Sequence, residues 1–146
     1  MAALMDAQQA LADLTEISSQ VRAAVLLDAT GQLVASTLAD ETRATALAEA
    51  CRDLLAAAEE ARRGGDRALT QLEAATRDGS VFVVREGDRV IAATTGPAPT
   101  VGLVFYDLKT CLRTVAAAGD GEAPKKRTSR KRAAKAAPEG NGDAEA

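Results

Sequence analysis

The chain has 146 residues, a length that predicts one domain with or without a tail. Histidine is absent, which removes the commonest general base and the commonest metal ligand of proteins. Only three aromatic residues occur, Phe82, Phe105 and Tyr106, so the core must be built from Leu, Val, Ile and Ala. The two cysteines, Cys51 and Cys111, form no C-x-x-C pair, which argues against a zinc site or a redox motif. We expect both to be reduced and buried as small apolar residues.

The sequence also lacks the motifs of common enzyme classes. It contains no G-x-x-x-x-G-K-[ST], so the chain is not itself a P-loop GTPase, and it contains neither G-x-S-x-G nor H-E-x-x-H. Asp28, Asp78 and Asp88 fall at predicted turns, where a turn role explains each carboxylate. We therefore expect no enzymatic activity, no cofactor and no metal site. Because no apolar run reaches 18 residues and residues 1–6 do not resemble a secretory signal, we expect a cytoplasmic protein.

Charge is unevenly distributed along the chain. Residues 1–118 carry 11 Lys and Arg against 16 Asp and Glu, whereas residues 119–146 carry 7 against 5. From residue 119 onward there is no Leu, Ile, Val, Met or aromatic residue, so apolar burial cannot offset the entropy cost of ordering. We predict one domain over residues 1–118 and a disordered tail over 119–146. The cations of the tail, all between 125 and 135, are Lys125, Lys126, Arg127, Arg130, Lys131, Arg132 and Lys135.

This basic run has two interpretations. It is typical of a segment that contacts nucleic acid, an anionic membrane or an acidic protein patch. It is equally typical of a solubilising tail with no specific partner. The run lacks the interleaved aromatic residues that favour binding to single-stranded nucleic acid.

The first half of the chain reads as a helix, a hairpin and a long helix. Apolar residues at helical spacing predict a helix over about 4–21. Two β-prone runs, 23–28 and 32–37, flank a connector that ends in Gly31, which predicts a hairpin with Asp28 as a turn-former. Asp40 is a suitable N-cap for a helix over about 41–62, with Gly64 and Gly65 as its stop. That helix is alanine-rich nearly all round, which suggests burial on more than one side.

The second half reads as three strands and a final helix. Turns containing Asp and Gly separate the β-prone runs 68–76, 80–85 and 89–95, which predicts consecutive antiparallel hairpins. The run 81–84 is apolar without alternation, as in a strand that is covered on both faces. A helix is expected over 101–117 with Thr100 as a possible cap. The order predicts an α+β layered fold, with the long middle helix on one sheet face and the two terminal helices on the other.

Several local stretches resemble one family when they are taken together. They are the Val25–Ser36 hairpin, the helix after Asp40, the Gly87–Ala93 turn and strand, and the Val101–Val104 helix start. In this order they resemble the roadblock (dynein light chain) family over about residues 4–117, and in size the chain resembles its small stand-alone bacterial members that work with a GTPase. The resemblance implies a five-stranded antiparallel sheet sandwiched between one long middle helix and two terminal helices. It also implies a homodimer in which sheet edges join and middle helices pair.

The family resemblance implies a non-enzymatic scaffold or regulatory protein for signalling that docks a Ras-like small GTPase or a related partner. An exposed edge strand at 68–76 fits such a dimer, since pairing with its own copy would cover it. The residues predicted to form the dimer or partner interface are Arg43, Leu47, Arg52, Leu55, Glu59, Leu69, Gln71 and Glu73. Two alternatives remain: a small-molecule sensor domain of the PAS or GAF type, and a nucleic-acid-associated protein that acts through the basic tail.

Overall fold

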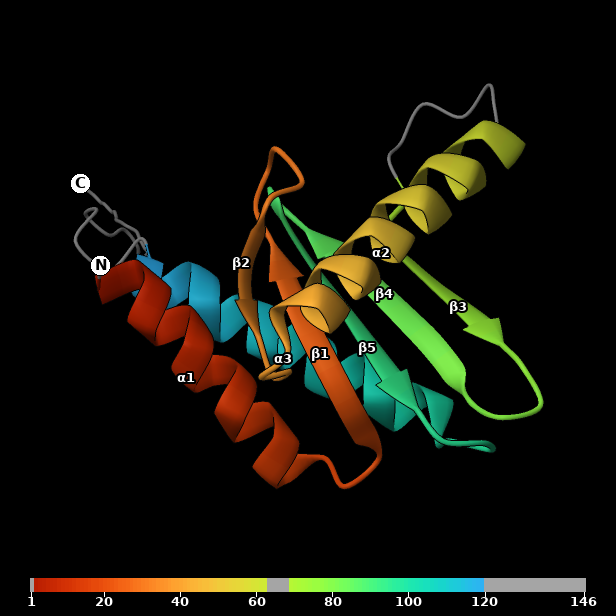
Figure 1. Ribbon diagram of the computed structural model, residues 1–146, viewed down its shortest axis with the longest axis horizontal. Helices are drawn as coiled ribbons and strands as arrows, with labels where there is room; N and C mark the ends of the chain where they lie inside the picture. The colour runs from red at the N-terminus through yellow and green to blue at the C-terminus, as the bar shows by residue number, and fades with distance from the viewer. Residues whose placement is uncertain (1, 63–68, 120–146) are drawn as a thin grey trace, which may run out of the picture. The chain divides into compact units, whose positions relative to one another are not determined.

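One antiparallel sheet organises the chain, and helices lie on both of its faces (Figure 1). The computed structural model describes residues 2–62 and 69–119. The five strands are arranged in the order β2-β1-β5-β4-β3, so β2 and β3 are the edges of the sheet. The elements in chain order are α1 (Ala2–Ile17), β1 (Val21–Leu27), β2 (Leu33–Ser36), α2 (Glu41–Ala61), β3 (Gln71–Ala75), β4 (Ser80–Glu86), β5 (Arg89–Thr95) and α3 (Val101–Gly119). The predicted α+β class and element order are confirmed.

The sheet separates two hydrophobic cores. Successive side chains of a strand point to opposite faces, so Leu26 packs toward α1 and α3 while Val25 and Leu27 pack toward α2. In β4, Phe82 joins the first core and Val83 the second, and both are fully buried. This confirms the prediction of a strand covered on both faces for residues 82–84, whereas Val81 stays partly exposed.

The two aromatic rings of the first core meet edge to face. The centroids of Phe82 and Phe105 are 5.0 Å apart, with the ring planes at 75°. Cys111 lies in this core and Cys51, on the sheet-facing side of α2, lies in the other, each buried and free, as predicted. Burial in apolar surroundings raises the pKa of each thiol to about 11.

The hairpin between β1 and β2 is built around Asp28. Its carboxylate accepts hydrogen bonds from the Thr30 hydroxyl at 2.7 Å, the Thr30 N–H at 2.9 Å and the Gln32 N–H at 3.0 Å. These hydrogen bonds hold the pKa of Asp28 below its usual value, and the bond from the Thr30 hydroxyl has the largest effect. Gly31 has a φ of +86°, the left-handed conformation for which glycine is suited. The predicted turn role of Asp28 is confirmed.

The N-terminus of α2 is capped as predicted. The Asp40 carboxylate accepts from the Thr42 N–H at 2.9 Å and the Arg43 N–H at 3.4 Å. The helix runs to Ala61, and Arg62 is its C-cap residue. The predicted glycine stop at 64–65 and the start of the predicted strand at 68 lie outside the described residues.

The predicted helix over 4–21 was too long. The structure ends α1 at Ile17, and the Ser18 N–H closes its last turn by donating to the Leu14 carbonyl at 2.8 Å. Val21 continues the helical spacing of apolar residues, yet it begins β1 and pairs with Thr95 of β5. Pairing with a central strand outweighs local periodicity at this position.

Within one chain, α2 is buried on one side only, against the sheet. Ala44 and Ala48, on the sheet-facing side of the helix, have exposures of 2% and 1%, whereas Ala46, Ala50 and Ala57 are exposed. The expectation of burial on more than one side is therefore not met by the single chain.

Candidate interaction surface

The two edges of the sheet differ in how they are covered. At the β2 edge, the Gln8 side chain of α1 reaches the backbone of Ser36: Nε2 donates to the Ser36 carbonyl at 2.6 Å, and Oε1 accepts from the Ser36 N–H at 3.4 Å. Thr37 donates its N–H to the Ala24 carbonyl of β1, so the backbone N–H and C=O of the adjacent residue Ser36 point away from β1. The Gln8 amide thus occupies the place of a neighbouring strand on this short edge.

The β3 edge presents its outer backbone groups. The Arg85 N–H donates to the Thr70 carbonyl at 2.8 Å, and the pairing of Gln71 with Val84 continues the ladder toward the turn. Since alternate residues of an antiparallel strand direct their N–H and C=O groups to the same side, those of Gln71, Glu73 and Ala75 point outward. Three consecutive pairs of this kind form a template for another strand.

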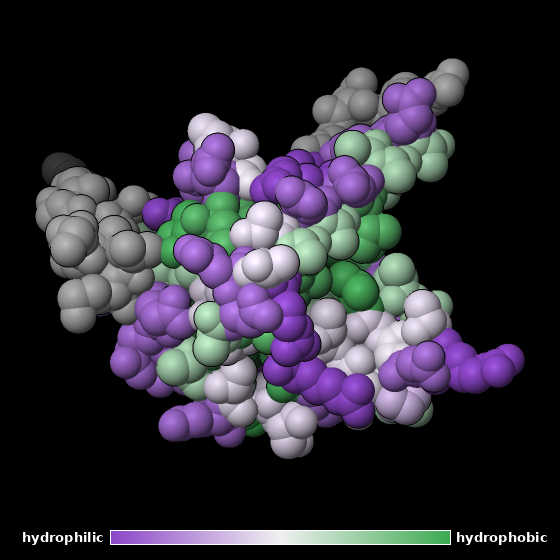
Figure 2. All heavy atoms as spheres, in the orientation of Figure 1, coloured by the Kyte–Doolittle hydropathy of each residue, from purple (hydrophilic) through white to green (hydrophobic). Residues whose placement is uncertain are grey.

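Hydrophobic side chains lie beside this edge. Leu47 and Leu54 of α2 and Leu72 and Val81 of β3 and β4 pack on the core under α2 but stay partly exposed. Figure 2 shows hydrophobic surface next to α2, above the part of the sheet that carries β3 and β4. We call this set of four residues, together with the outer edge of β3, the β3–α2 surface.

Glu59 ties the end of α2 to the start of β3. Its carboxylate accepts from the Leu69 N–H at 2.8 Å and from the Arg85 guanidinium, and it forms an ion pair with Arg62 at 3.4 Å. The pKa of Glu59 lies below its usual value, mainly because of the hydrogen bond from the Leu69 N–H, and Arg85 and Arg62 lower it further. The contact fixes the β3 edge relative to the helix beside it.

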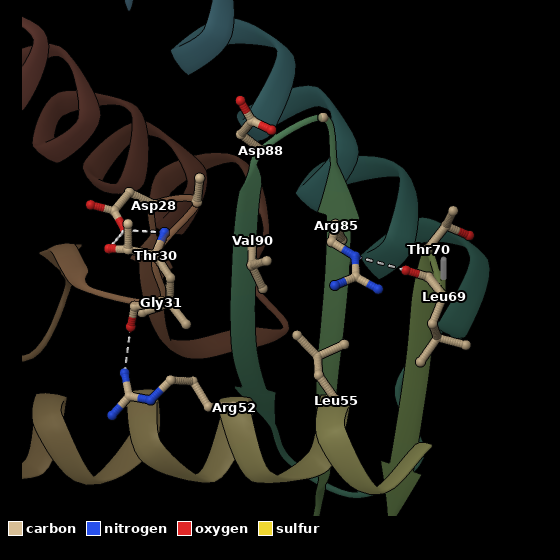
Figure 3. A pocket seen from close by; sticks show the side chains of 13 residues that line it. Asp28, Thr30, Gly31, Arg52, Leu55, Leu69, Thr70, Arg85, Asp88 and Val90 are labelled. Carbon is tan, nitrogen blue, oxygen red and sulfur yellow. Dashed lines mark hydrogen bonds between the residues drawn. The ribbon is translucent and has the colours of Figure 1, made fainter. Parts of the chain in front are cut away.

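A pocket of about 570 Å³ lies where α2, the β1–β2 turn and the β4–β5 turn approach one another (Figure 3). Arg52 donates to the Gly31 carbonyl, and Arg85 donates to the Leu69 carbonyl at 3.0 Å, so both guanidinium groups hold loops of the fold. Asp28 and Asp88 also line the pocket, which therefore carries both signs of charge. These contacts give the pocket's arginines a structural role.

The residues predicted for the interface fall into three groups in the structure. Leu55 is buried, with an exposure of 8%, while Arg52 and Glu59 are engaged within the fold. Leu47 and Leu69 are half-buried against the core under α2. The remaining positions, on or near the outer surface, are Arg43, Gln71 and Glu73.

Sequence reasoning missed part of this surface. Leu72 was not singled out, although the alternation of polar and apolar residues in β3 gave a signal for it. Leu54 and Val81 appeared only within the predicted helix over 41–62 and the apolar run 81–84, with no role at the surface. Nothing local marked Gln8, because its partner lies 28 residues away. The seven tail cations lie outside the described residues.

Two features are absent from the described residues. None of the described helices is both long enough and apolar enough to cross a membrane. Over the same residues, no cluster of three or more Cys, Asp or Glu side chains has an arrangement that could hold a metal ion.

The geometry defines a class of protein: a small α+β layered domain whose main feature is a sheet edge with an apolar flank. The profile of the Roadblock/LC7 domain family matches residues 7–95, and the chain belongs to that family. No curated protein matches the sequence.

Solved structures share the fold at low sequence identity. MglB of Myxococcus xanthus is similar with a TM-score of 0.69 at 18% identity, over 85% of this chain and 95% of that one. A Roadblock/LC7 domain from Streptomyces avermitilis gives a TM-score of 0.66 at 17% identity, over 75% and 93%. The gliding protein MglB of Thermus thermophilus gives 0.62 at 17% identity, over 83% and 93%. These likenesses confirm the predicted fold.

Proposed function

We propose that two copies of this chain join through the β3–α2 surface, and that the dimer is a regulatory scaffold that docks a Ras-like small GTPase or a related signalling partner. The single observation that carries the proposal is the inequality of the two sheet edges. Gln8 covers the Ser36 backbone at the β2 edge, whereas three outward backbone pairs of β3, from Gln71 to Ala75, are available to a second strand. A two-fold axis at β3 would extend the sheet across both copies.

The helix beside the edge supports the same arrangement. The outer side of α2 carries small residues, Ala46, Ala50 and Ala57, which allow two helices to approach closely. Leu54 and Leu72, partly exposed in the single chain, would become covered by the second copy. Apolar burial of this kind is the main favourable contribution to association.

The comparisons support self-association and a regulatory role by analogy. One solved relative carries the description "MglB with tetrameric arrangement", which concerns that protein alone. The roadblock resemblance implies platforms and partners for GTPases, and membership of the family favours this reading over a PAS or GAF sensor. The nucleic-acid alternative depends on residues 125–135, which lie outside the described part of the chain, and the comparisons give it no support.

Light scattering after gel filtration tests the dimer. The wild-type chain should elute with twice the 15.0 kDa mass of one copy. Glu73→Pro removes one outward N–H without touching the ladder to β4, so this variant should be monomeric with an unchanged circular dichroism spectrum. Glu73→Thr keeps the N–H and is the matched control that should remain a dimer. A wild-type monomer at micromolar concentration would end the proposal.

Binding of a GTPase is tested separately. The purified dimer is presented to a Ras-like GTPase from the same cells, loaded either with GDP or with a non-hydrolysable GTP analogue, and association is measured by interferometry. We expect binding that depends on the nucleotide and that is lost in Glu73→Pro. A stable dimer that binds neither form would contradict the GTPase half of the proposal and leave the scaffold half in place.

A further inference from the structure

A second hollow lies on the other side of the sheet, between α1 and α3. It has a volume of about 270 Å³, and Ala10, Leu14 and Cys111 form part of its apolar lining. The Cys111 thiol donates to the Ala10 carbonyl at 3.7 Å, which joins the two helices at this point. The volume is below the range of about 300–1,000 Å³ that is typical of small-molecule sites, so it suits a protein side chain better than a cofactor.

The rim of this groove is hydrophobic and exposed. Ile17 of α1 is 72% exposed and Tyr106 of α3 is 65% exposed, the highest values among the exposed large hydrophobic residues of the described chain. Both line the same groove. Leu103, 49% exposed, lies one helical turn before Tyr106 and extends the apolar strip along α3. Scattered apolar residues are ordinary on a surface, but this grouping around a hollow is typical of a docking site.

The charge in the lining of the groove has one sign. Asp13 and Asp107 are part of the lining, and no Lys or Arg is. Helix α1 contains three carboxylates and no cation in its sequence. Helix α3 carries Lys109 and Arg113 outside the lining, and the Arg113 guanidinium is paired with Glu86 at 2.8 Å. An occupant of the groove therefore meets an apolar floor between carboxylates.

We propose that the α1–α3 groove docks an amphipathic helix of a partner protein, with an apolar anchor side chain in the hollow and Lys or Arg residues against Asp13 and Asp107. Binding of an apolar helix face in a hydrophobic groove is a recurring mode of peptide recognition. Charge complementarity at the rim selects the cationic partner and speeds its association. The groove lies on the sheet face opposite α2, so a partner here leaves the β3–α2 surface free.

The proposal is tested with two synthetic helical peptides that carry Leu at the i, i+3, i+4 and i+7 positions. One peptide has Lys at the remaining positions and the other has Glu. The full chain should bind the Lys peptide with an anisotropy change that weakens as salt is raised, and it should bind the Glu peptide poorly. The double variant Ile17→Asp with Tyr106→Asp should lose affinity by about tenfold or more, as expected for the removal of central apolar anchors.

Two further variants separate a specific groove from general charge attraction. Ala12→Asp adds one negative charge, against the two of the double variant, at an exposed position on another side of α1, and it should change the affinity by less than about twofold. The charge reversal Asp13→Lys with Asp107→Lys should exchange the preference, so that the Glu peptide becomes the better ligand.

Three results would overturn the proposal. The first is equal binding of both peptides to the wild-type chain, and the second is unchanged binding of the Lys peptide by the Ile17→Asp and Tyr106→Asp variant. The third is a fall in the solution mass on that double substitution, because the groove would then be occupied by a second copy of the chain. Failure of the dimer proposal at β3 would leave each of these measurements valid.

Discussion

The turn between β3 and β4 depends on the absence of a side chain at Gly79. A Cβ atom at this position would lie 2.2 Å from the carbonyl oxygen of Thr95 and 3.3 Å from its carbonyl carbon. The obstacle is backbone, and Thr95 is itself paired with Ser80 across the β4–β5 ladder. Rotation of a side chain cannot relieve the contact, so Gly79→Ala must displace the turn or the end of β5.

The size of the effect follows from the groups that would move. Overpacking of this kind costs about 1–3 kcal/mol. Thr76 donates its N–H to the Gly79 carbonyl at 2.7 Å and its hydroxyl to the same oxygen at 2.8 Å, and a weakened bond costs about 1 kcal/mol. We expect Gly79→Ala to lower the free energy of unfolding by about 2–4 kcal/mol, or roughly 8–16 °C in Tm for a domain of this size.

Gly87→Ala is the matched control for this prediction. Gly87 has a φ of +62° but nothing within 4 Å of a Cβ atom, so alanine there meets only the left-handed conformational cost of about 1 kcal/mol. Both variants are melted under circular dichroism at one protein concentration, because self-association would shift Tm. The reasoning fails if Gly79→Ala melts with the wild type or above Gly87→Ala.

Three further predictions concern the edge, pH and the thiols. Gln8→Ala uncovers the Ser36 backbone, so it should lower the free energy of unfolding by about 1 kcal/mol. It should also produce species larger than the wild type in light scattering at high concentration, and an unchanged mass would contradict the role of Gln8 as an edge cover. The pKa of Glu59 is lowered on folding, so the stabilising effect of its carboxylate is complete above about pH 5 and is lost as the pH falls through the folded pKa. Urea titrations at a series of pH values should therefore show a shallower loss of stability in acid for Glu59→Gln than for the wild type. Parallel curves for the two proteins would count against this prediction. Burial raises the pKa values of Cys51 and Cys111 to about 11. Neither thiol should therefore react with a disulfide reagent at pH 8 until urea unfolds the chain. A prompt reaction of the folded protein would show that the thiols are accessible.

What the sequence determined by itself was local. The Asp40 cap, the Asp28 turn and the glycine of the first hairpin each involve residues no more than four positions apart, so the sequence pattern alone predicted them. The apolar run 81–84 indicated a strand covered on both faces, because only such a strand tolerates apolar side chains at every position. Together these features predicted the element order and the layered fold, and the edge position of the third strand.

What only the tertiary structure decided was which distant groups meet. The end of α1 at Ile17 was set by the pairing of Val21 with β5, which local periodicity does not encode. The contact of Glu59 with Leu69 spans 10 residues. The cover that Gln8 gives to the β2 edge and the groove between α1 and α3 join segments that are more remote in sequence. Such contacts depend on how layers pack, and a one-dimensional pattern of hydrophobicity and charge carries no information on that packing.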